Sequence, residues 1–284
     1  MGSGLICPHP SPLARGEGGG AEGEGAILEL RQVTRMFGGL AAVKDFDLAV
    51  PAGSIFGLIG PNGAGKTTVF NLITGANPAS SGRVVFGGHD ITTEPAYAIN
   101  RLGIARTFQN VRLFKSISVA DNVRTAASWR AGYGWVSGVF QGMTHARREA
   151  DMDAAVMALL DAFDLADKAR EQAQSLPYGE QRRLEIVRAL ATRPRLLLLD
   201  EPAAGLNATE TNELMALVHR IRDERGVTIL LIEHDMRLVM GICECIAVLD
   251  HGVKISEGCP SDVQGDPQVI AAYLGQQEPD HAPS

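Results

Sequence analysis

A glycine-rich segment, Gly60–Thr67, carries the strongest chemical signal in the sequence. It reads GPNGAGKT and fits the pattern G-x-x-x-x-G-K-[ST], between an apolar run and a stretch of helical character. Glycines at these positions let backbone N–H groups curl around phosphates, and the start of a helix adds the positive end of its dipole. We therefore expect a nucleotide-phosphate site made of Gly60, Pro61, Asn62, Gly63, Ala64, Gly65, Lys66, Thr67 and Thr68.

Two side chains of this segment have the chemistry to act on a bound nucleotide. Lys66 is expected to reach the β- and γ-phosphates, and Thr67 to ligate Mg²⁺ through its hydroxyl. The pattern by itself does not separate kinases, GTPases and motor ATPases. A GTPase is disfavoured because the chain has no N-K-x-D motif for guanine.

Two adjacent acids, Asp200 and Glu201, follow the apolar run Leu196–Leu199. A run of this kind predicts a buried strand, so both carboxylates are expected at its carboxyl end. Asp200 is the candidate to hold Mg²⁺, usually through water, and Glu201 is the candidate base that polarises the attacking water. The alternative is that Glu201 is an ordinary surface acid or caps a helix.

A histidine, His234, comes just after the apolar run Ile229–Ile232. At the tip of a strand in the same sheet, its imidazole can approach the γ-phosphate and take a catalytic role. A histidine elsewhere in the chain would more often simply be packed, and we single out none of the other six.

Expected strands and helices alternate along the chain and must position these residues. This alternation predicts an α/β fold with a mostly parallel sheet. Structure is expected to begin near Ile27. The expected strands are 46–50, 54–59, 83–86, 196–199, 228–232 and 245–249, and the expected helices are 67–74, 179 to before 194, and 211–225. Residues 119–170 are expected to be mostly helical, interrupted at 132–142, which indicates a helical subdomain inserted between two portions of the sheet.

Composition limits the classes of partner. The net charge of -7 in 284 residues argues against a nucleic-acid partner, because no excess of cations is available to neutralise phosphates. No apolar stretch approaches the roughly 20 residues of a membrane span, so a role at a membrane requires docking onto another chain. Residues 16–25 contain no apolar residue but Ala21, and we expect 1–25 to be disordered, 26–275 to form one domain and 276–284 to be a flexible tail.

Further motifs, taken with the two above, resemble those of the ABC ATPases over residues 27–275. Gln109 lies in TFQNVRLF, which resembles the Q-loop, and LPYGEQ at 176–181 resembles the signature motif. Asn207 ends AGLN, where the D-loop is expected, and Phe37 lies upstream where an aromatic stacks on adenine. The resemblance implies a P-loop NTPase with a RecA-like core, an N-terminal antiparallel β subdomain and an inserted helical subdomain at about 110–178.

The resemblance also implies ligands and roles. ATP and Mg²⁺ are the implied cofactors, with Gln109 touching Mg²⁺ or the attacking water as a metal-site and catalytic residue. Gly179, Glu180 and Asn207 are implied to contact nucleotide, where two ATPase subunits sandwich two ATP molecules head to tail.

Two departures from the ABC pattern affect the signature and the D-loop. Pro177 stands where serine is usual, Tyr178 and Glu180 replace a glycine and a glutamine, and Asn207 replaces an aspartate. Without the serine hydroxyl, the ATP site that this signature completes is expected to be less active, which puts equal hydrolysis at the two sites in doubt.

A finer resemblance is to the ATP-binding subunits of branched-chain amino acid importers. It rests on the strings RTFQNVRLF, YGEQRRLEIVRAL, LDEPAAGLN, LLIEHDMRLVMGI and AAYLG. It implies a second ATPase subunit, two integral membrane permease subunits, a periplasmic or extracellular solute-binding protein, and a place on the cytoplasmic face of the cell membrane. The alternatives are a related solute such as urea, short amides or other amino acids, and a soluble ABC protein acting on DNA or ribosomes. The single set of motifs disfavours the last.

The segment Gln109–Ile117 is the candidate for coupling movements of this chain to membrane subunits. Val111, Leu113, Phe114 and Ile117 are apolar and follow Gln109 directly. In related transporters this neighbourhood forms a groove for a short helix of the membrane subunit. The alternative is that these residues fill the interface between the sheet and the helical subdomain.

Overall fold

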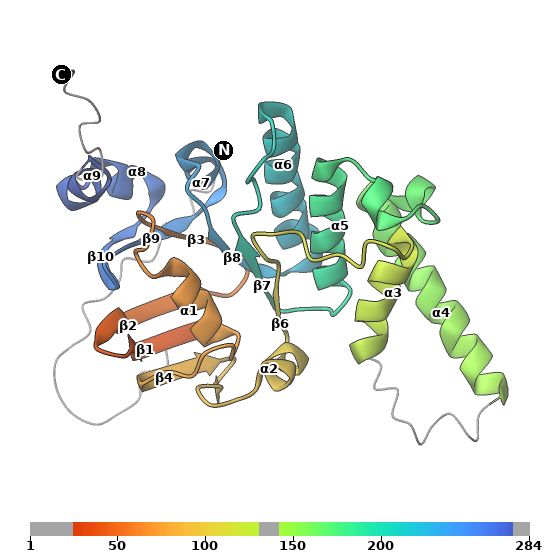
Figure 1. Cartoon of the computed structure of the whole chain (residues 1–284), viewed down its shortest axis with the longest axis horizontal. Coiled ribbons are helices and arrows are strands. Elements are labelled where there is room, and N and C mark those ends of the chain that lie inside the picture. Colours follow the sequence, from red (N-terminus) through yellow and green to blue (C-terminus); the bar gives the residue numbers. More distant parts are fainter. Residues whose placement is uncertain (1–24, 131–141, 275–284) are drawn as a thin grey trace. The chain divides into compact units, whose positions relative to one another are not determined.

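The computed structural model describes residues 25–130 and 142–274 (Figure 1). The chain consists of two compact units. The first unit combines residues 1–99 and 215–284, and the second is residues 100–214. Three predictions concern segments that lie outside the described residues, apart from Gly25 and Gly142. They are the disorder of 1–25, the interruption of the helical stretch at 132–142 and the flexible tail at 276–284. The predicted limits of one domain at 26–275, with a subdomain at about 110–178, stay a prediction.

The first unit contains an antiparallel sheet of four strands in the order β2-β1-β4-β5. Its strands are β1 (Ala26–Phe37), β2 (Leu40–Pro51), β4 (Ser81–Phe86) and β5 (His89–Asp90). In β2 the side chains of Phe46, Leu48 and Val50 are buried, which confirms the strand predicted from their alternation. This sheet is the N-terminal antiparallel part that the sequence resemblance implied.

The same unit also contains parallel strands, on which the glycine-rich loop is built. Strand β3 (Ile55–Ile59) pairs in parallel with β8 (Thr228–Ile232) on one side and with β9 (Cys245–Asp250) on the other, and β10 (Val253–Gly258) pairs antiparallel to β9. Every residue of β3 and β8 is buried, as expected of short aliphatic runs in a covered parallel sheet. The helices that follow these strands are α1 (Lys66–Ile73), α7 (Met236–Ile242), α8 (Pro260–Gly265) and α9 (Pro267–Leu274).

The second unit combines one parallel strand pair with helices. Strand β6 (Ile104–Arg106) pairs with β7 (Leu196–Asp200), which is buried throughout. The helices are α3 (Val119–Arg130), α4 (Gly142–Asp161) and α5 (Tyr178–Leu190), with 3-10 turns at Ala166–Lys168 and Ala173–Ser175. Helix α3 contacts both α4 and α5. The mostly helical character predicted for 119–170 is therefore confirmed where the residues are described.

Two helices run across the division between the units. They are α2 (Ala96–Leu102) and α6 (Ala208–Arg225). Among the described helices, none is long and apolar enough to cross a membrane.

Candidate active site

The glycines of the phosphate loop, Gly60–Thr67, are required by the backbone around them. Gly60 has a φ of 146°, and a Cβ there would lie 1.9 Å from the carbonyl oxygen of Leu249. Gly65 has a φ of 107°, and a Cβ there would lie 2.4 Å from the carbonyl oxygen of Ala42. Neighbouring backbone therefore packs directly against both ends of the loop, and any side chain would push it out of shape.

The start of α1 offers donors for an anion. Lys66 is buried, and its Nζ donates to the carbonyl oxygens of Gly60 at 2.6 Å and Pro61 at 2.8 Å. The cation is thus held inside the curl of the loop. Gly65 is the N-cap of α1 and makes no side-chain cap hydrogen bond, while the side chain of Thr67 is exposed. A cradle of glycine backbone, a helix start and an ammonium group suits the phosphates of a nucleotide.

His234 lies at the same edge of the sheet as the phosphate loop. Strands β3 and β8 are parallel neighbours, with Leu58 paired to Ile232, and the loop and His234 follow their carboxyl ends. The imidazole is exposed, with Nδ1 3.9 Å from a carboxylate oxygen of Glu233. Glu233 is fully buried and accepts the backbone N–H of His234 at 3.1 Å, so it fixes the turn that presents the histidine.

Phe37 ends β1 and is exposed, as an adenine-stacking residue must be. The guanidinium carbon of Arg35 lies 4.6 Å from the centre of its ring, which is the geometry of a cation–π contact. The ring of Phe37 therefore already has one contact within the chain, with Arg35. Its stacking on a nucleotide stays a prediction.

Replacing Phe37 with alanine is expected to weaken ATP binding by about 0.5–1.5 kcal/mol, because one face of aromatic contact is lost. GTP binding should weaken about equally, since stacking does not read the hydrogen-bonding edge of the base. The measurement is the affinity of both nucleotides, with Met36→Ala as a control at the neighbouring exposed position. Unchanged affinity would remove Phe37 from the nucleotide site.

In the second unit, Asp200 ends β7 and forms a buried ion pair. Its Oδ2 lies 2.7 Å from an Nη2 of Arg106 on β6, and the two side chains are 6% and 8% exposed. Arg106 could not be predicted from the sequence, because nothing in the local pattern connects it to an acid on another strand. The pair orients the carboxylate at the strand end, as its predicted role at Mg²⁺ requires.

Glu201, the predicted base, lies beside Gln109. Its Oε2 accepts a hydrogen bond of 2.6 Å from Nε2 of Gln109. Its backbone has a φ of 46°, which is unusual for a residue with a side chain and marks a strained turn directly after β7. The second unit thus brings together the two residues that the sequence predicted to act on the attacking water.

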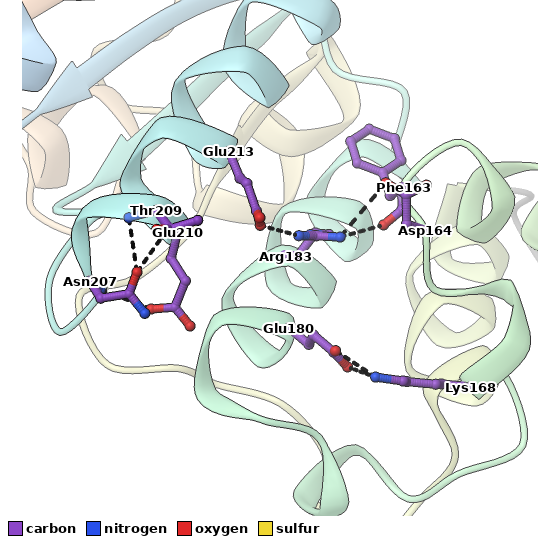
Figure 2. A network of polar contacts seen from close by, with 9 residues as sticks. All are labelled: Phe163, Asp164, Lys168, Glu180, Arg183, Asn207, Thr209, Glu210 and Glu213. Atoms are coloured by element: carbon purple, nitrogen blue, oxygen red, sulfur yellow. Dashed lines mark hydrogen bonds and ion pairs between the residues drawn. The ribbon is translucent and has the colours of Figure 1, made fainter.

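The signature and D-loop residues have contacts within the second unit (Figure 2). The carboxylate of Glu180 pairs with Lys168 at 2.5 Å, and a Cβ on Gly179 would lie 2.8 Å from Oε1 of Glu210. Asn207 accepts the backbone N–H of Glu210 at 3.0 Å and that of Thr209 at 2.9 Å, so it caps helix α6. These contacts give Glu180 and Asn207 a structural role, and Gly179 lies close to the side chain of Glu210. The contact of all three residues with nucleotide stays a prediction.

The predicted metal ligands divide between the units. Thr67 belongs to the first unit, and Gln109 and Asp200 belong to the second. Within residues 25–130 and 142–274, the structure gathers no group of three or more His, Cys, Asp and Glu side chains as a metal site. A hydroxyl and a carboxylate are nevertheless ligands that Mg²⁺ accepts beside phosphate oxygens and water.

Comparison with known proteins gives consistent results. The family model of the ABC transporter matches residues 43–204, and that of the branched-chain amino acid ATP-binding cassette transporter matches residues 253–279. The high-affinity branched-chain amino acid transport ATP-binding protein BraF of Pseudomonas aeruginosa is 44% identical over 250 residues, covering 88% of this chain and 98% of BraF. LivG of Escherichia coli K12, of the same description, is 42% identical with the same coverage.

A solved structure has the same fold. The ADP conformation of an ATP-binding cassette of an ABC transporter superposes with a TM-score of 0.77 at 29% identity, covering 88% of this chain and 99% of that one. The α/β fold predicted from the alternation of strands and helices is therefore confirmed.

Proposed function

The chain belongs to the family of ABC transporter ATP-binding proteins, and we propose that it is the ATP-hydrolysing subunit of an importer of branched-chain amino acids. For hydrolysis, the observation that carries the proposal is the hydrogen bond between Gln109 and Glu201 at the end of β7. For the solute, the support is the similarity to BraF and LivG along nearly their whole length. A related solute such as urea, a short amide or another amino acid is the alternative.

The chain's own residues supply binding and positioning for phosphoryl transfer to water. The phosphate loop and Lys66 hold the phosphates, and catalysis of this reaction is mainly electrostatic. Thr67, Asp200 and Gln109 are the residues proposed to hold Mg²⁺, which when bound would supply positive charge against the phosphate oxygens. Glu201 polarises the attacking water while Gln109 fixes its carboxylate, and His234 is placed at the carboxyl edge of the sheet to approach the γ-phosphate.

A second ATPase subunit completes the ATP sites in this proposal. The start of α5, with Gly179 and Glu180, and the D-loop at Asn207 would face nucleotide held by that subunit. Pro177 is the N-cap of α5 and provides no side-chain hydrogen bond there. The ATP site that this helix completes is therefore proposed to be the less active of the two.

The remaining proposed partners lie in the membrane and outside it. They are two integral membrane permease subunits and a solute-binding protein on the periplasmic or extracellular side, with this chain on the cytoplasmic face. Phe114 is the proposed contact for the permease because it is 53% exposed, although large and aromatic, while its neighbour Leu113 is buried.

The backbone under Phe114 is braced. The side chain of the buried Asn122 accepts the N–H of Phe114 at 2.9 Å and donates to its carbonyl oxygen at 3.0 Å. A rigid backbone that presents an exposed aromatic ring is suited to docking a partner with little ordering cost.

Replacing Phe114 with aspartate is expected to abolish assembly with the permease subunits and uptake of leucine, isoleucine and valine. ATP binding and the melting temperature of the isolated subunit should stay near the wild-type values, because the ring is exposed and the ring contact described for it is with the guanidinium of Arg188, 5.7 Å from its centre. A charge buried at the docking surface would be costly, on the order of several kcal/mol.

The measurement combines co-purification from membranes, uptake and a melting curve. Tyr97→Asp is a matched control, since Tyr97 is an equally exposed aromatic on α2. Loss of folding in Phe114→Asp would indicate that the ring packs inside this chain, and normal uptake would contradict the docking role.

A further inference from the structure

Two oppositely charged side chains are buried on the helix that begins with the signature residues. Arg182 and Glu185 on α5 are 4% and 3% exposed, one turn apart, with Nη1 of the arginine 3.5 Å from Oε2 of the glutamate. Burial raises the pKa of Glu185, and the N–H groups and arginines around it only partly oppose that shift. Apolar residues in place of a buried ion pair often leave stability unchanged or higher. Stability alone therefore does not account for these two charges.

Both side chains hold the backbone on either side of Gln109. Oε1 of Glu185 accepts the N–H of Phe108 at 3.4 Å and that of Arg112 at 3.2 Å. The guanidinium of Arg182 donates to the carbonyl oxygen of Phe108 at 2.9 Å and also to that of Gln109. Four backbone groups in residues 108–112 are thus bound by one buried pair, while the side chain of Gln109 extends to Glu201.

The same arginine also contacts the first residue of α5. Its Nε donates to the hydroxyl of Tyr178 at 3.1 Å, and its guanidinium carbon lies 5.5 Å from the centre of that ring. Tyr178 is exposed at the start of the helix. A continuous set of contacts therefore runs from the exposed start of α5, through Arg182, to the backbone of Gln109.

We propose that Arg182 and Glu185 are positioning residues that hold Gln109 against Glu201, and that Tyr178 links this arrangement to nucleotide bound at the start of α5. The inference rests on the proposed function, in which that nucleotide belongs to the second ATPase subunit. Occupancy of one ATP site would then set the geometry of the attacking water at the other.

Arg182→Lys tests the positioning role, because it keeps the positive charge but loses the planar fork that reaches two carbonyl groups. We expect turnover of ATP by the assembled transporter to fall about tenfold, the scale of one charge-assisted hydrogen bond, while ATP affinity stays within about twofold. The matched control is Arg183→Lys. Arg183 is next to Arg182 but points to Asp164 and Glu213 (Figure 2), and its replacement should leave turnover unchanged.

A double-mutant cycle with Gln109→Ala shows whether the pair acts through that residue. Arg182→Lys should cause little further loss in a Gln109→Ala background, because the group that it positions is already absent. Full additivity of the two losses would overturn the inference. So would a drop in ATP affinity that equals the drop in turnover, since that would indicate a general loss of structure.

A readout that does not depend on hydrolysis separates this inference from the proposed function. Glu185→Met keeps the length of the side chain but removes the oxygen that accepts the amides of Phe108 and Arg112, and hydrogen exchange of these two amides should become faster than in the wild type. Unchanged exchange would overturn the positioning role even in an active transporter. A wild-type chain that hydrolyses no ATP would instead contradict the proposed function, with the exchange result still deciding whether the pair fixes the loop.

Discussion

Replacing Glu201 with glutamine is expected to leave ATP bound and to slow its hydrolysis by about 10²- to 10⁴-fold, the range that a positioned general base contributes. The amide has nearly the same size as the carboxylate but cannot polarise the attacking water. The backbone of Glu201 has a φ of 46°, and glutamine carries the same conformational cost there as glutamate, so the turn after β7 should keep its shape. The loss would then report chemistry and not folding.

The experiment measures ATP turnover, ATP affinity and the size of the assembly. With hydrolysis stopped, bound ATP should keep two ATPase subunits together, which appears as a larger species in size exclusion. Glu213→Gln is the control, because Glu213 is an exposed acid of the same unit that pairs only with Arg183 among the contacts described. Normal turnover in Glu201→Gln would show that another residue activates the water.

The phosphate loop could be predicted because its chemistry and its geometry are local. The residues that the motif needs all lie within Gly60–Thr67 and its two flanks, a buried strand and a helix. The structure adds why Gly60 and Gly65 are obligatory, since the backbone of Leu249 and Ala42 leaves no room for a Cβ. Those contacts come from distant parts of the chain and are invisible in the motif.

The long strand β1 was missed because its alternation is broken. Its pairing with β2 contains several register shifts, and Gln32 in its middle has a φ of 50°. These irregularities move side chains off the two-residue period on which strand prediction depends. The short helices α7, α8 and α9 were missed for a related reason, since six to eight residues are too few to establish a helical period.

The charged residues around Gln109 and Asp200 could not be found from spacing. Arg106 lies 94 positions from Asp200, and Arg182 lies 73 positions from Gln109, yet each pair is in contact. A buried charge appears in the sequence as an ordinary surface residue until its partner is known. The sequence therefore indicated the groups proposed to touch nucleotide and water more readily than the groups that position them.

Replacing Lys66 with alanine is expected to lower ATP affinity by at least about tenfold, since a charge-assisted hydrogen bond to phosphate is worth roughly 1.5–3 kcal/mol. Turnover should fall further, by about 10³-fold or more, because the cation stabilises charge that grows on the transferred phosphoryl group. AMP affinity should hardly change, because Lys66 is expected to serve the β- and γ-phosphates.

A second variant separates the charge of Lys66 from its structural contacts. The ammonium donates to the carbonyl oxygens of Gly60 and Pro61, so alanine also removes two hydrogen bonds that brace the loop. Lys66→Gln keeps a donor for those carbonyls but has no charge. We expect both variants to lose turnover, and Lys44→Ala, at an exposed position on β2, to retain it. If Lys66→Gln hydrolysed ATP at the wild-type rate, the role of Lys66 would be to brace the loop, and the electrostatic account of this site would be wrong.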